Sequence, residues 1–123
     1  MAQILIVEDN LEMLEILKRA LEAKGYDVEV AAGGQAGLDA YNKKQFDVVV
    51  TDIVMPGVDG LEFVKAVRNI DKTTKIIAIS GGGADMEASY ALNVADIYGA
   101  DVELYKPFSL EEFMERVAGL LAE

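Results

Sequence analysis

The chain has 123 residues, enough for one domain with a core of its own, and its hydrophobic share of 52 % is typical of a globular protein. Its formal charge is −11, from 22 acidic and 11 basic residues, which argues against DNA, RNA or an anionic membrane surface as a direct partner. It contains no cysteine and no histidine, which removes disulfides, thiolate metal sites and the usual general base.

The first half of the chain alternates short apolar runs with amphipathic stretches. Residues 3–7 predict a buried strand rather than a signal peptide, because no basic region precedes them. Apolar residues then recur at helical spacing up to Gly25, which we expect just after the C-terminal end of a helix. Residues 26–31 predict a second strand near an edge of the sheet, and residues 33–44 predict a helix. The apolar stripe of that helix is thin: Ala36, Ala40 and Tyr41.

The second half continues the alternation. A β-branched run at 47–52 predicts a strand that is buried on both faces and ends at Asp52. Asp59 and Glu62 have the spacing of a capping box, which opens a helix through about residue 70. The remaining predicted elements are strands at 75–80 and 102–105, a loop at Gly81-Gly82-Gly83, a helix to about residue 97 closed by Gly99, and a last helix from Ser109.

In the helix from about residue 60 and in the last helix, the sequence also predicts which side chains face the core. Ser109 and Glu112 form a second capping box, and Phe108 with Phe113 can staple the start of that helix. The expected inward faces are Phe63, Val64, Val67 and Ile70 in the helix from about 60, and Leu110, Phe113, Met114, Val117, Leu120 and Leu121 in the last helix.

Strict alternation of strands and helices predicts a parallel sheet with helices on both faces. For five strands and five helices in a chain of this size, we expect the doubly wound, flavodoxin-like strand order 2-1-3-4-5. Strands 1 and 3 are then neighbours, and the point where the strand order reverses lies between their carboxyl ends. Glu8, Asp9 and Asp52 follow those two ends.

Three carboxylates that lie close together repel one another unless they share protons or bind a cation. A single acid after a strand is more often a solvated loop residue, but three acids that converge favour a cation-binding site. Oxygen ligands in this number suit Mg²⁺. Ser80 and Lys106 end two further strands at the same edge. A divalent ion, an ammonium and a hydroxyl together suit a phosphoryl group, and Asp52 is the natural acceptor.

Two enzyme-like or cofactor-binding alternatives fit less well. A phosphatase of the haloacid dehalogenase type needs a second aspartate two residues after the nucleophile, and here that position is Val54. A flavin-binding module of the same topology needs donors for an anionic phosphate after the first strand, where Glu8 and Asp9 would repel it.

The motifs together resemble a known family over the whole chain. They are Val7-Glu8-Asp9-Asn10, the segment Asp52-Ile53-Val54-Met55-Pro56-Gly57-Val58-Asp59-Gly60, Ser80, and Lys106-Pro107-Phe108. In this order and spacing they resemble the receiver domain of two-component response regulators, of the CheY-like single-domain type.

The resemblance implies a role for each of these residues. Asp52 would accept a phosphoryl group from a phosphohistidine on a sensor histidine kinase or a histidine phosphotransfer protein. Asp9, Asp52 and the backbone carbonyl of Val54 would bind Mg²⁺, with Glu8 acting largely through water. Lys106 and Ser80 would contact the phosphoryl oxygens. The family's lysine–proline bond is usually cis, whereas X–Pro bonds in general are mostly trans.

The resemblance also implies a function. Residues 1–123 would form one receiver domain without an output domain, in the cytoplasm, that changes its affinity for a downstream protein or relays the phosphoryl group. It would be no ordinary enzyme, but would phosphorylate itself from small donors and dephosphorylate slowly, because Val54 and Gly82 offer attacking water no acid or base. No membrane insertion is expected, since no apolar run approaches the roughly 20 residues that span a bilayer.

One position departs from the family pattern. Many members carry an aromatic residue where this chain has Glu103, and its nearest aromatic to the lysine is Tyr105. Signalling could run through Tyr105 or through the Gly81-Gly82-Gly83 loop. A module that binds partners without accepting phosphoryl is the remaining alternative, which the presence of Asp9, Asp52, Ser80 and Lys106 disfavours.

Overall fold

The structure is a computed structural model that describes residues 1–53, 60–80 and 99–123. Its strands are β1 (Gln3–Val7), β2 (Asp27–Ala31), β3 (Val48–Asp52), β4 (Lys75–Ser80) and β5 (Val102–Tyr105). Its helices are α1 (Leu11–Ala23), α2 (Gly34–Lys43), α3 (Gly60–Ile70) and α5 (Leu110–Leu121). The helix predicted up to residue 97, the Gly81-Gly82-Gly83 loop and the cap at Asp59 lie outside the described residues. No described helix is long and apolar enough to cross a bilayer.

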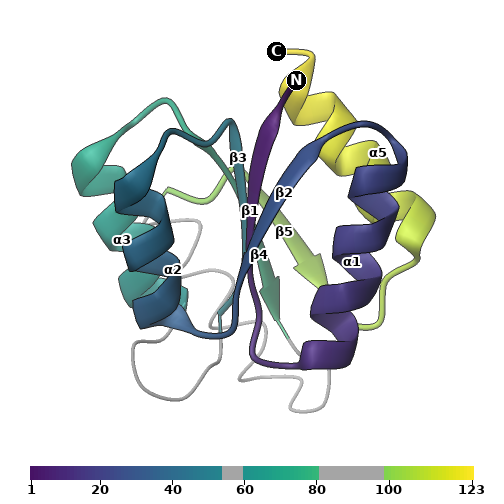
Figure 1. Cartoon of the computed structure of the whole chain (residues 1–123), viewed down its shortest axis with the longest axis horizontal. Helices are drawn as coiled ribbons and strands as arrows, with labels where there is room; N and C mark the ends of the chain where they lie inside the picture. The colour runs from purple at the N-terminus through teal and green to yellow at the C-terminus, as the bar shows by residue number, and fades with distance from the viewer. Residues whose placement is uncertain (54–59, 81–98) are drawn as a thin grey trace.

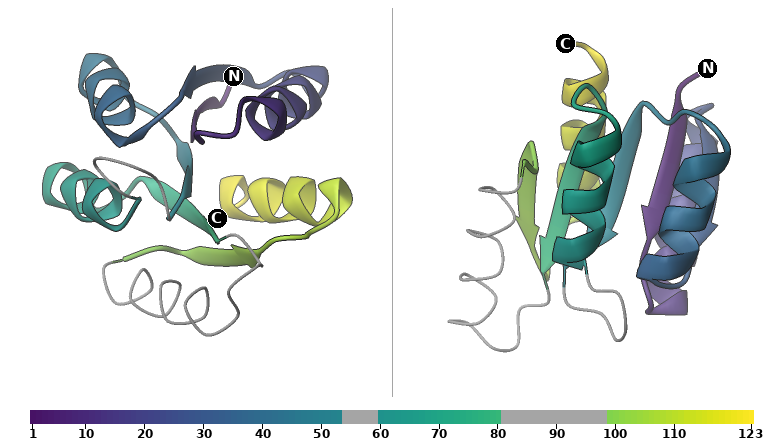
Figure 2. Two further views of the ribbon diagram at one scale, coloured as in Figure 1. Left: turned by 90° about the horizontal axis from the view of Figure 1, so that it is seen from below. Right: turned by 90° about the vertical axis from the view of Figure 1, so that its left-hand side faces the viewer.

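The five strands form one parallel sheet in the order β2-β1-β3-β4-β5, as predicted, with β2 at an edge. Figure 1 shows the strands running in one direction, with both chain termini at the edge where the strands begin. Seen from below in Figure 2, the sheet lies between α2 and α3 on one side and α1 and α5 on the other. The carboxyl ends of all five strands therefore meet at the edge away from the termini.

The core consists of two apolar layers, one on each face of the sheet. Leu5 and Val49 pack with α2 and α3, whereas Ile4 and Val50 pack with α1 and α5. Successive residues of a strand point to opposite faces, so a strand covered on both sides must be apolar at every position. This explains why β1 and β3 appear in the sequence as continuous apolar runs.

The predicted helix ends are confirmed where the structure describes them. Gly25 follows α1 with a φ of +91°, a conformation that glycine adopts without steric cost. The backbone N–H of Glu112 donates to the Ser109 hydroxyl over 2.9 Å at the start of α5. The rings of Phe108 and Phe113 lie 6.0 Å apart, as expected for a hydrophobic staple.

Three residues predicted to face the core are exposed instead. Ala36 is exposed, and Ile70 and Leu110 are 56 % and 42 % exposed. Ile70 is the last residue of α3 and Leu110 the first of α5, so neither is covered as the middle of its helix is. In α2 the residue next to Ala36, Gly37, is buried against the sheet instead, and a Cβ there would lie 2.8 Å from Cγ2 of Val7. Because glycine carries no side chain, hydrophobic periodicity does not reveal that face.

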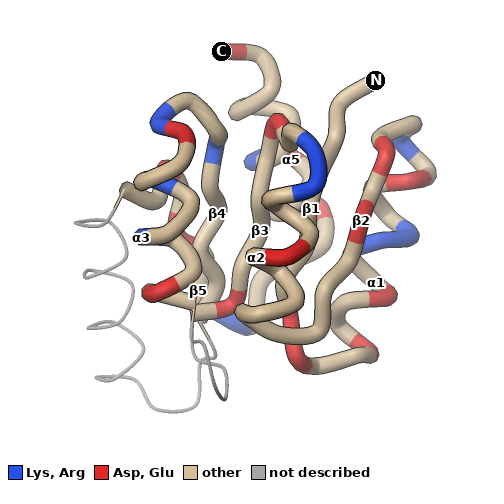
Figure 3. The backbone as a smooth tube through the Cα atoms, turned by 60° about the vertical axis from the view of Figure 1, so that its left-hand side comes forward, with Lys and Arg blue, Asp and Glu red and all other residues tan. Residues whose placement is uncertain are grey.

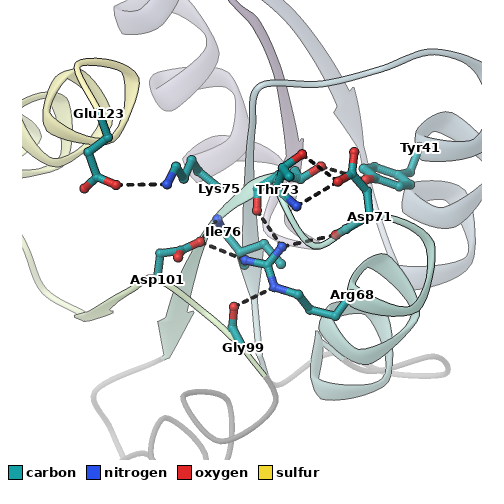
Figure 4. Close-up of polar contacts among 10 residues, drawn as sticks. Tyr41, Arg68, Asp71, Thr73, Lys75, Ile76, Gly99, Asp101 and Glu123 are labelled. Carbon is teal, nitrogen blue, oxygen red and sulfur yellow. Dashed lines mark hydrogen bonds and ion pairs between the residues drawn. The ribbon is translucent and has the colours of Figure 1, made fainter.

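A partly buried arginine ties three elements together at the edge of the sheet opposite Asp52 (Figure 4). From α3, Arg68 donates through Nε to the carbonyl of Gly99 over 2.9 Å and through Nη1 to that of Thr74 over 2.6 Å. Its Nη2 lies 2.9 Å from Oδ2 of Asp101, which also accepts the backbone N–H of Ile76 over 2.8 Å. One guanidinium thus joins α3 to the beginnings of β4 and β5.

We expect Arg68→Ala to lower the free energy of unfolding by about 2–4 kcal/mol, because it removes the side-chain donor to the Gly99 and Thr74 carbonyls and the positive charge beside the Asp101 carboxylate. Arg68→Lys should recover only part of this, since one ammonium cannot reach acceptors on several sides as a planar guanidinium does. Urea unfolding monitored by circular dichroism measures both changes.

The matched control is Arg19→Ala. Arg19 pairs with Glu15 on α1 over 2.9 Å, but the two side chains are 78 % and 47 % exposed. A solvent-exposed pair of this kind contributes at most about 0.5 kcal/mol. Equal losses for Arg19→Ala and Arg68→Ala would contradict a structural role of the Arg68 network.

Candidate functional site

Carboxylates from β1 and β3 converge at the carboxyl edge of the sheet, as predicted. Val7 is paired with Thr51 across the two strands, so Glu8, Asp9 and Asp52 follow at the same level. One oxygen of each of these three acids lies within 4.8 Å of the others. Glu8 and Asp52 are 2 % and 5 % exposed, whereas Asp9 is exposed. This edge therefore holds two buried acids and one that faces solvent.

Lys106, which follows β5, reaches into this acidic cluster. Its Nζ lies 3.1 Å from Oε1 of Glu8 and 3.1 Å from Oδ2 of Asp52. Figure 3 shows basic and acidic positions meeting at this edge of the sheet. The Lys106–Pro107 bond is cis. Burial lowers the pKa of the Lys106 ammonium, but the charge of Asp52 and the hydrogen bond and charge of Glu8 outweigh it, so the net pKa is raised.

The second oxygen of Glu8 holds the start of α1. Oε2 accepts the backbone N–H of Asn10 over 3.1 Å, and the Asn10 side chain then accepts the N–H of Met13 over 3.0 Å as the cap of α1. Both oxygens of Glu8 are thus engaged within the protein, which suits a carboxylate that acts on a cation through water. The capping role of Asn10 was not predicted, although an asparagine directly before an amphipathic stretch is a cap signal.

Ser80 ends β4 at the same edge and is fully buried. Its backbone carbonyl accepts the N–H of Lys106 over 2.9 Å. Its hydroxyl oxygen has no hydrogen-bond partner, the one buried side-chain polar atom of the described residues in that state. A buried hydroxyl left unpaired costs about 1–3 kcal/mol, and such groups are found where a ligand supplies the missing partner.

Comparison with known proteins settles the family. A model described as the response regulator receiver domain matches residues 4–118. This chain belongs to that family.

Relatives and solved structures agree with the assignment. This receiver domain is 39 % identical over 119 residues to the transcriptional regulatory protein TrcR of Mycobacterium tuberculosis, covering 97 % of this chain and 45 % of TrcR. It is 33 % identical to the response regulator ArlR of Staphylococcus aureus, covering 98 % of this chain and 53 % of ArlR. The chain thus spans about half the length of these curated relatives.

Two solved structures cover nearly the whole receiver domain. The chemotaxis protein CheY4 of Vibrio cholerae has a TM-score of 0.86 at 33 % identity and covers 98 % of both chains. The response regulator TrrA of Thermotoga maritima has a TM-score of 0.84 at 32 % identity, covering 98 % of this chain and 99 % of that one.

The remaining predicted site residues of this receiver domain are placed only in part. Val54 and Gly82 lie outside the described residues. On β5, Glu103 is half-buried and Tyr105 is 47 % exposed, and residues two apart in a strand share one face. The choice between Tyr105 and another route for signalling stays a prediction.

Repulsion within the acidic cluster yields a testable effect at Asp9. Partial loss of hydration beside the buried acids, followed by the hydrogen bond and negative charge of Glu8, raises the pKa of Asp9 above its ordinary 3.8. A raised carboxyl pKa means that stability falls as the pH rises through the window above 3.8. In EDTA at neutral pH, Asp9→Asn should therefore raise the melting temperature by about 2–5 °C, and the gain should vanish at acid pH.

We expect Mg²⁺ to stabilise the parent protein and the same variant to lose this stabilisation, because the amide is a poorer ligand for a hard cation. Differential scanning fluorimetry with EDTA or Mg²⁺ measures both effects, and Asp39→Asn on the exposed side of α2 is the control. An Asp9→Asn variant that Mg²⁺ stabilises as strongly as the parent would exclude Asp9 as a ligand.

Proposed function

We propose that Asp52 accepts a phosphoryl group from a phosphohistidine of a partner protein in the presence of Mg²⁺. The observation that carries the proposal is the composition of one edge of the sheet. There, Glu8, Asp9 and Asp52 lie around a lysine ammonium, and the unpaired hydroxyl of Ser80 ends the neighbouring strand.

The transfer would proceed by a direct displacement at phosphorus. One carboxylate oxygen of Asp52 forms the new bond to phosphorus while the bond from phosphorus to the imidazole nitrogen breaks, and that electron pair leaves with the imidazole. The Lys106 ammonium, which already lies 3.1 Å from Asp52, would neutralise charge on the phosphoryl oxygens. The Ser80 hydroxyl would donate a hydrogen bond to one of them.

The residues at this edge fit Mg²⁺, because they offer oxygen ligands only. Asp9, Asp52 and the backbone carbonyl of Val54 would hold the ion, with Glu8 acting through water. Mg²⁺ supplies positive charge that offsets the repulsion between the carboxylates and the incoming phosphoryl oxygens. The similar protein TrrA was crystallised in complex with Mg²⁺ and BeF, which supports this assignment.

The partners would be proteins. A sensor histidine kinase or a histidine phosphotransfer protein would donate the phosphoryl group, docking near the start of α1, and a downstream protein would read the phosphorylated state. The net charge of −11 disfavours direct binding of nucleic acid. We place this signalling in the cytoplasm, with residues 1–123 forming one receiver domain.

The protein would be a phosphoprotein switch rather than an enzyme with a separate substrate. Asp52 and its neighbours would catalyse self-phosphorylation from small phosphodonors and a slow loss of the phosphoryl group. A measured lifetime of seconds for the aspartyl-phosphate would contradict the slow loss.

The test is to incubate the protein with Mg²⁺ and acetyl phosphate and to record its intact mass. The expected result is a gain of one phosphoryl group that EDTA prevents, because the acids cannot accept a further anion without the cation. A protein that gains no phosphoryl group under any Mg²⁺ concentration would favour the module that only binds partners.

A further inference from the structure

We infer that Gly60 is a positioning residue for Asp52: its missing side chain lets the start of α3 lie against the peptide that follows Asp52, which holds the carboxylate in place. This inference deepens the proposed function, since it rests on Asp52 as the phosphoryl acceptor. In the sequence Gly60 stands out only as the last residue of the motif that begins at Asp52, and the sequence does not show what its backbone contacts.

The contact between Gly60 and β3 is one of backbone against backbone. A Cβ built on Gly60 would overlap the carbonyl oxygen of Asp52 and the Cα of Ile53, and would lie 2.8 Å from the carbonyl carbon of Asp52. In addition, the N–H of Gly60 donates to the carbonyl of Ile53 over 2.9 Å. Backbone atoms cannot rotate away as a side chain can, so any larger residue must displace α3 or the end of β3.

Two hydrogen bonds hold the peptide that joins Asp52 to Ile53. The hydroxyl of Thr51, which is fully buried, donates to the Asp52 carbonyl over 2.9 Å. The N–H of Ile53 donates to the carbonyl of Ile79 on β4 over 2.8 Å. The peptide between Asp52 and Ile53 is therefore held by β3 itself, by β4 and by the first residue of α3.

This restraint matters because the protein's contribution to phosphoryl transfer consists almost entirely of positioning and electrostatic stabilisation. The carboxylate of Asp52 is attached to the restrained backbone and meets the Lys106 ammonium at 3.1 Å. A displacement of about 1 Å at a reacting group can cost about 10²-fold in rate. A shift of the Asp52 backbone by an added methyl group at position 60 would move the carboxylate relative to Lys106 and to the Mg²⁺ ligands.

The glycines of the chain supply a matched control. Gly119 lies within α5, and a Cβ there would meet nothing within 4 Å. Gly119→Ala therefore makes the same chemical change in a helix without a steric conflict. Leu120→Ala is the control for lost stability, because Leu120 is buried at the opposite edge of the sheet, beside Asp47 and Lys75.

The experiment measures Mg²⁺ affinity by thermal shift and the rate of phosphorylation by acetyl phosphate, at a temperature well below all melting points. We expect Gly60→Ala to weaken Mg²⁺ binding and slow phosphorylation by about tenfold or more. Gly119→Ala and Leu120→Ala should keep both values within about twofold of the parent, whatever their melting temperatures. A Gly60→Ala variant that behaves as Leu120→Ala does would overturn the inference and reduce Gly60 to a structural role.

A second readout needs neither Mg²⁺ nor phosphorylation, so it separates the inference from the proposed function. In EDTA, Lys106→Met should lower the melting temperature of the parent but lower that of Gly60→Ala by clearly less, because the pair with Asp52 is already displaced. Equal shifts in the two backgrounds would overturn the inference. A parent that binds no Mg²⁺ and accepts no phosphoryl group would instead overturn the proposed function alone.

Thr51→Val serves if Gly60→Ala does not fold. Valine has nearly the shape of threonine and removes only the hydroxyl that donates to the Asp52 carbonyl. We expect a smaller fall in Mg²⁺ affinity and phosphorylation rate, of about two- to fivefold. Values equal to those of the parent would show that the position of the Asp52 peptide does not limit the site, and would overturn the inference.

Discussion

Asp52→Asn is expected to lose the Mg²⁺-dependent phosphoryl adduct completely. The amide carries no negative charge and is a poor nucleophile, so the bond from phosphorus to the side-chain oxygen does not form. Asparagine keeps the shape of the side chain and can still accept a hydrogen bond from Lys106, so the variant should remain folded. Intact mass after incubation with acetyl phosphate measures the loss.

The control for this prediction is Asp47→Asn. Asp47 directly precedes β3, whereas Asp52 is the last residue of that strand. Asp47 is exposed at the opposite edge of the sheet, where its Oδ2 accepts the N–H of Gln3 over 2.8 Å. This variant should gain the phosphoryl group as the parent does. An adduct that persists in Asp52→Asn would assign the acceptor to another residue, and an adduct that both variants lose would contradict a specific role of Asp52.

Lys106→Met is expected to slow phosphorylation of Asp52 by about 10²-fold, because it removes a preorganised positive charge from the place where the phosphoryl oxygens arrive. The same change should destabilise the protein in EDTA, since Glu8 and Asp52 are then buried carboxylates without their cation. Mg²⁺ should therefore stabilise the variant more than the parent. Rates from mass spectrometry and melting curves with and without Mg²⁺ test both statements.

The pH dependence gives this prediction a further check. The folded protein raises the pKa of Lys106 above its ordinary 10.5, so the ammonium stabilises the fold fully below that pH. The difference in melting temperature between the parent and Lys106→Met should stay constant from neutral pH to near 10.5 and shrink as the pH rises through the raised pKa. Lys72→Met, an exposed lysine between α3 and β4, should show no such difference.

Much of the fold was predictable because local patterns and the global sheet agree. The continuous apolar runs of β1 and β3 predict strands buried on both faces, and alternation with helices predicts parallel pairing in the observed order. The cap at Ser109 was predictable for the same reason, since its partner is three residues away. Patterns of this kind depend on short separations in the chain.

The errors fall where a pattern lacks information about neighbours. Ile70 and Leu110 match the helical period, but each stands at a helix end that the sheet does not cover. Gly37 has no side chain and so adds nothing to the hydrophobic pattern, yet it is buried, and a Cβ there would lie 2.8 Å from Cγ2 of Val7. The Arg68 network was likewise not predictable, because a guanidinium can bond to carbonyls anywhere within its reach.

The sequence by itself determined which chemical groups this receiver domain offers at the carboxyl edge: three acids, a hydroxyl and a lysine, all delivered by strand ends. Only the tertiary structure decided how those groups meet. Lys106 bonds to Glu8 across 98 positions of the chain, and Gly60 lies against the peptide that follows Asp52. The physical reason is that such contacts depend on packing between elements, and the local spacing of residues carries no record of that packing.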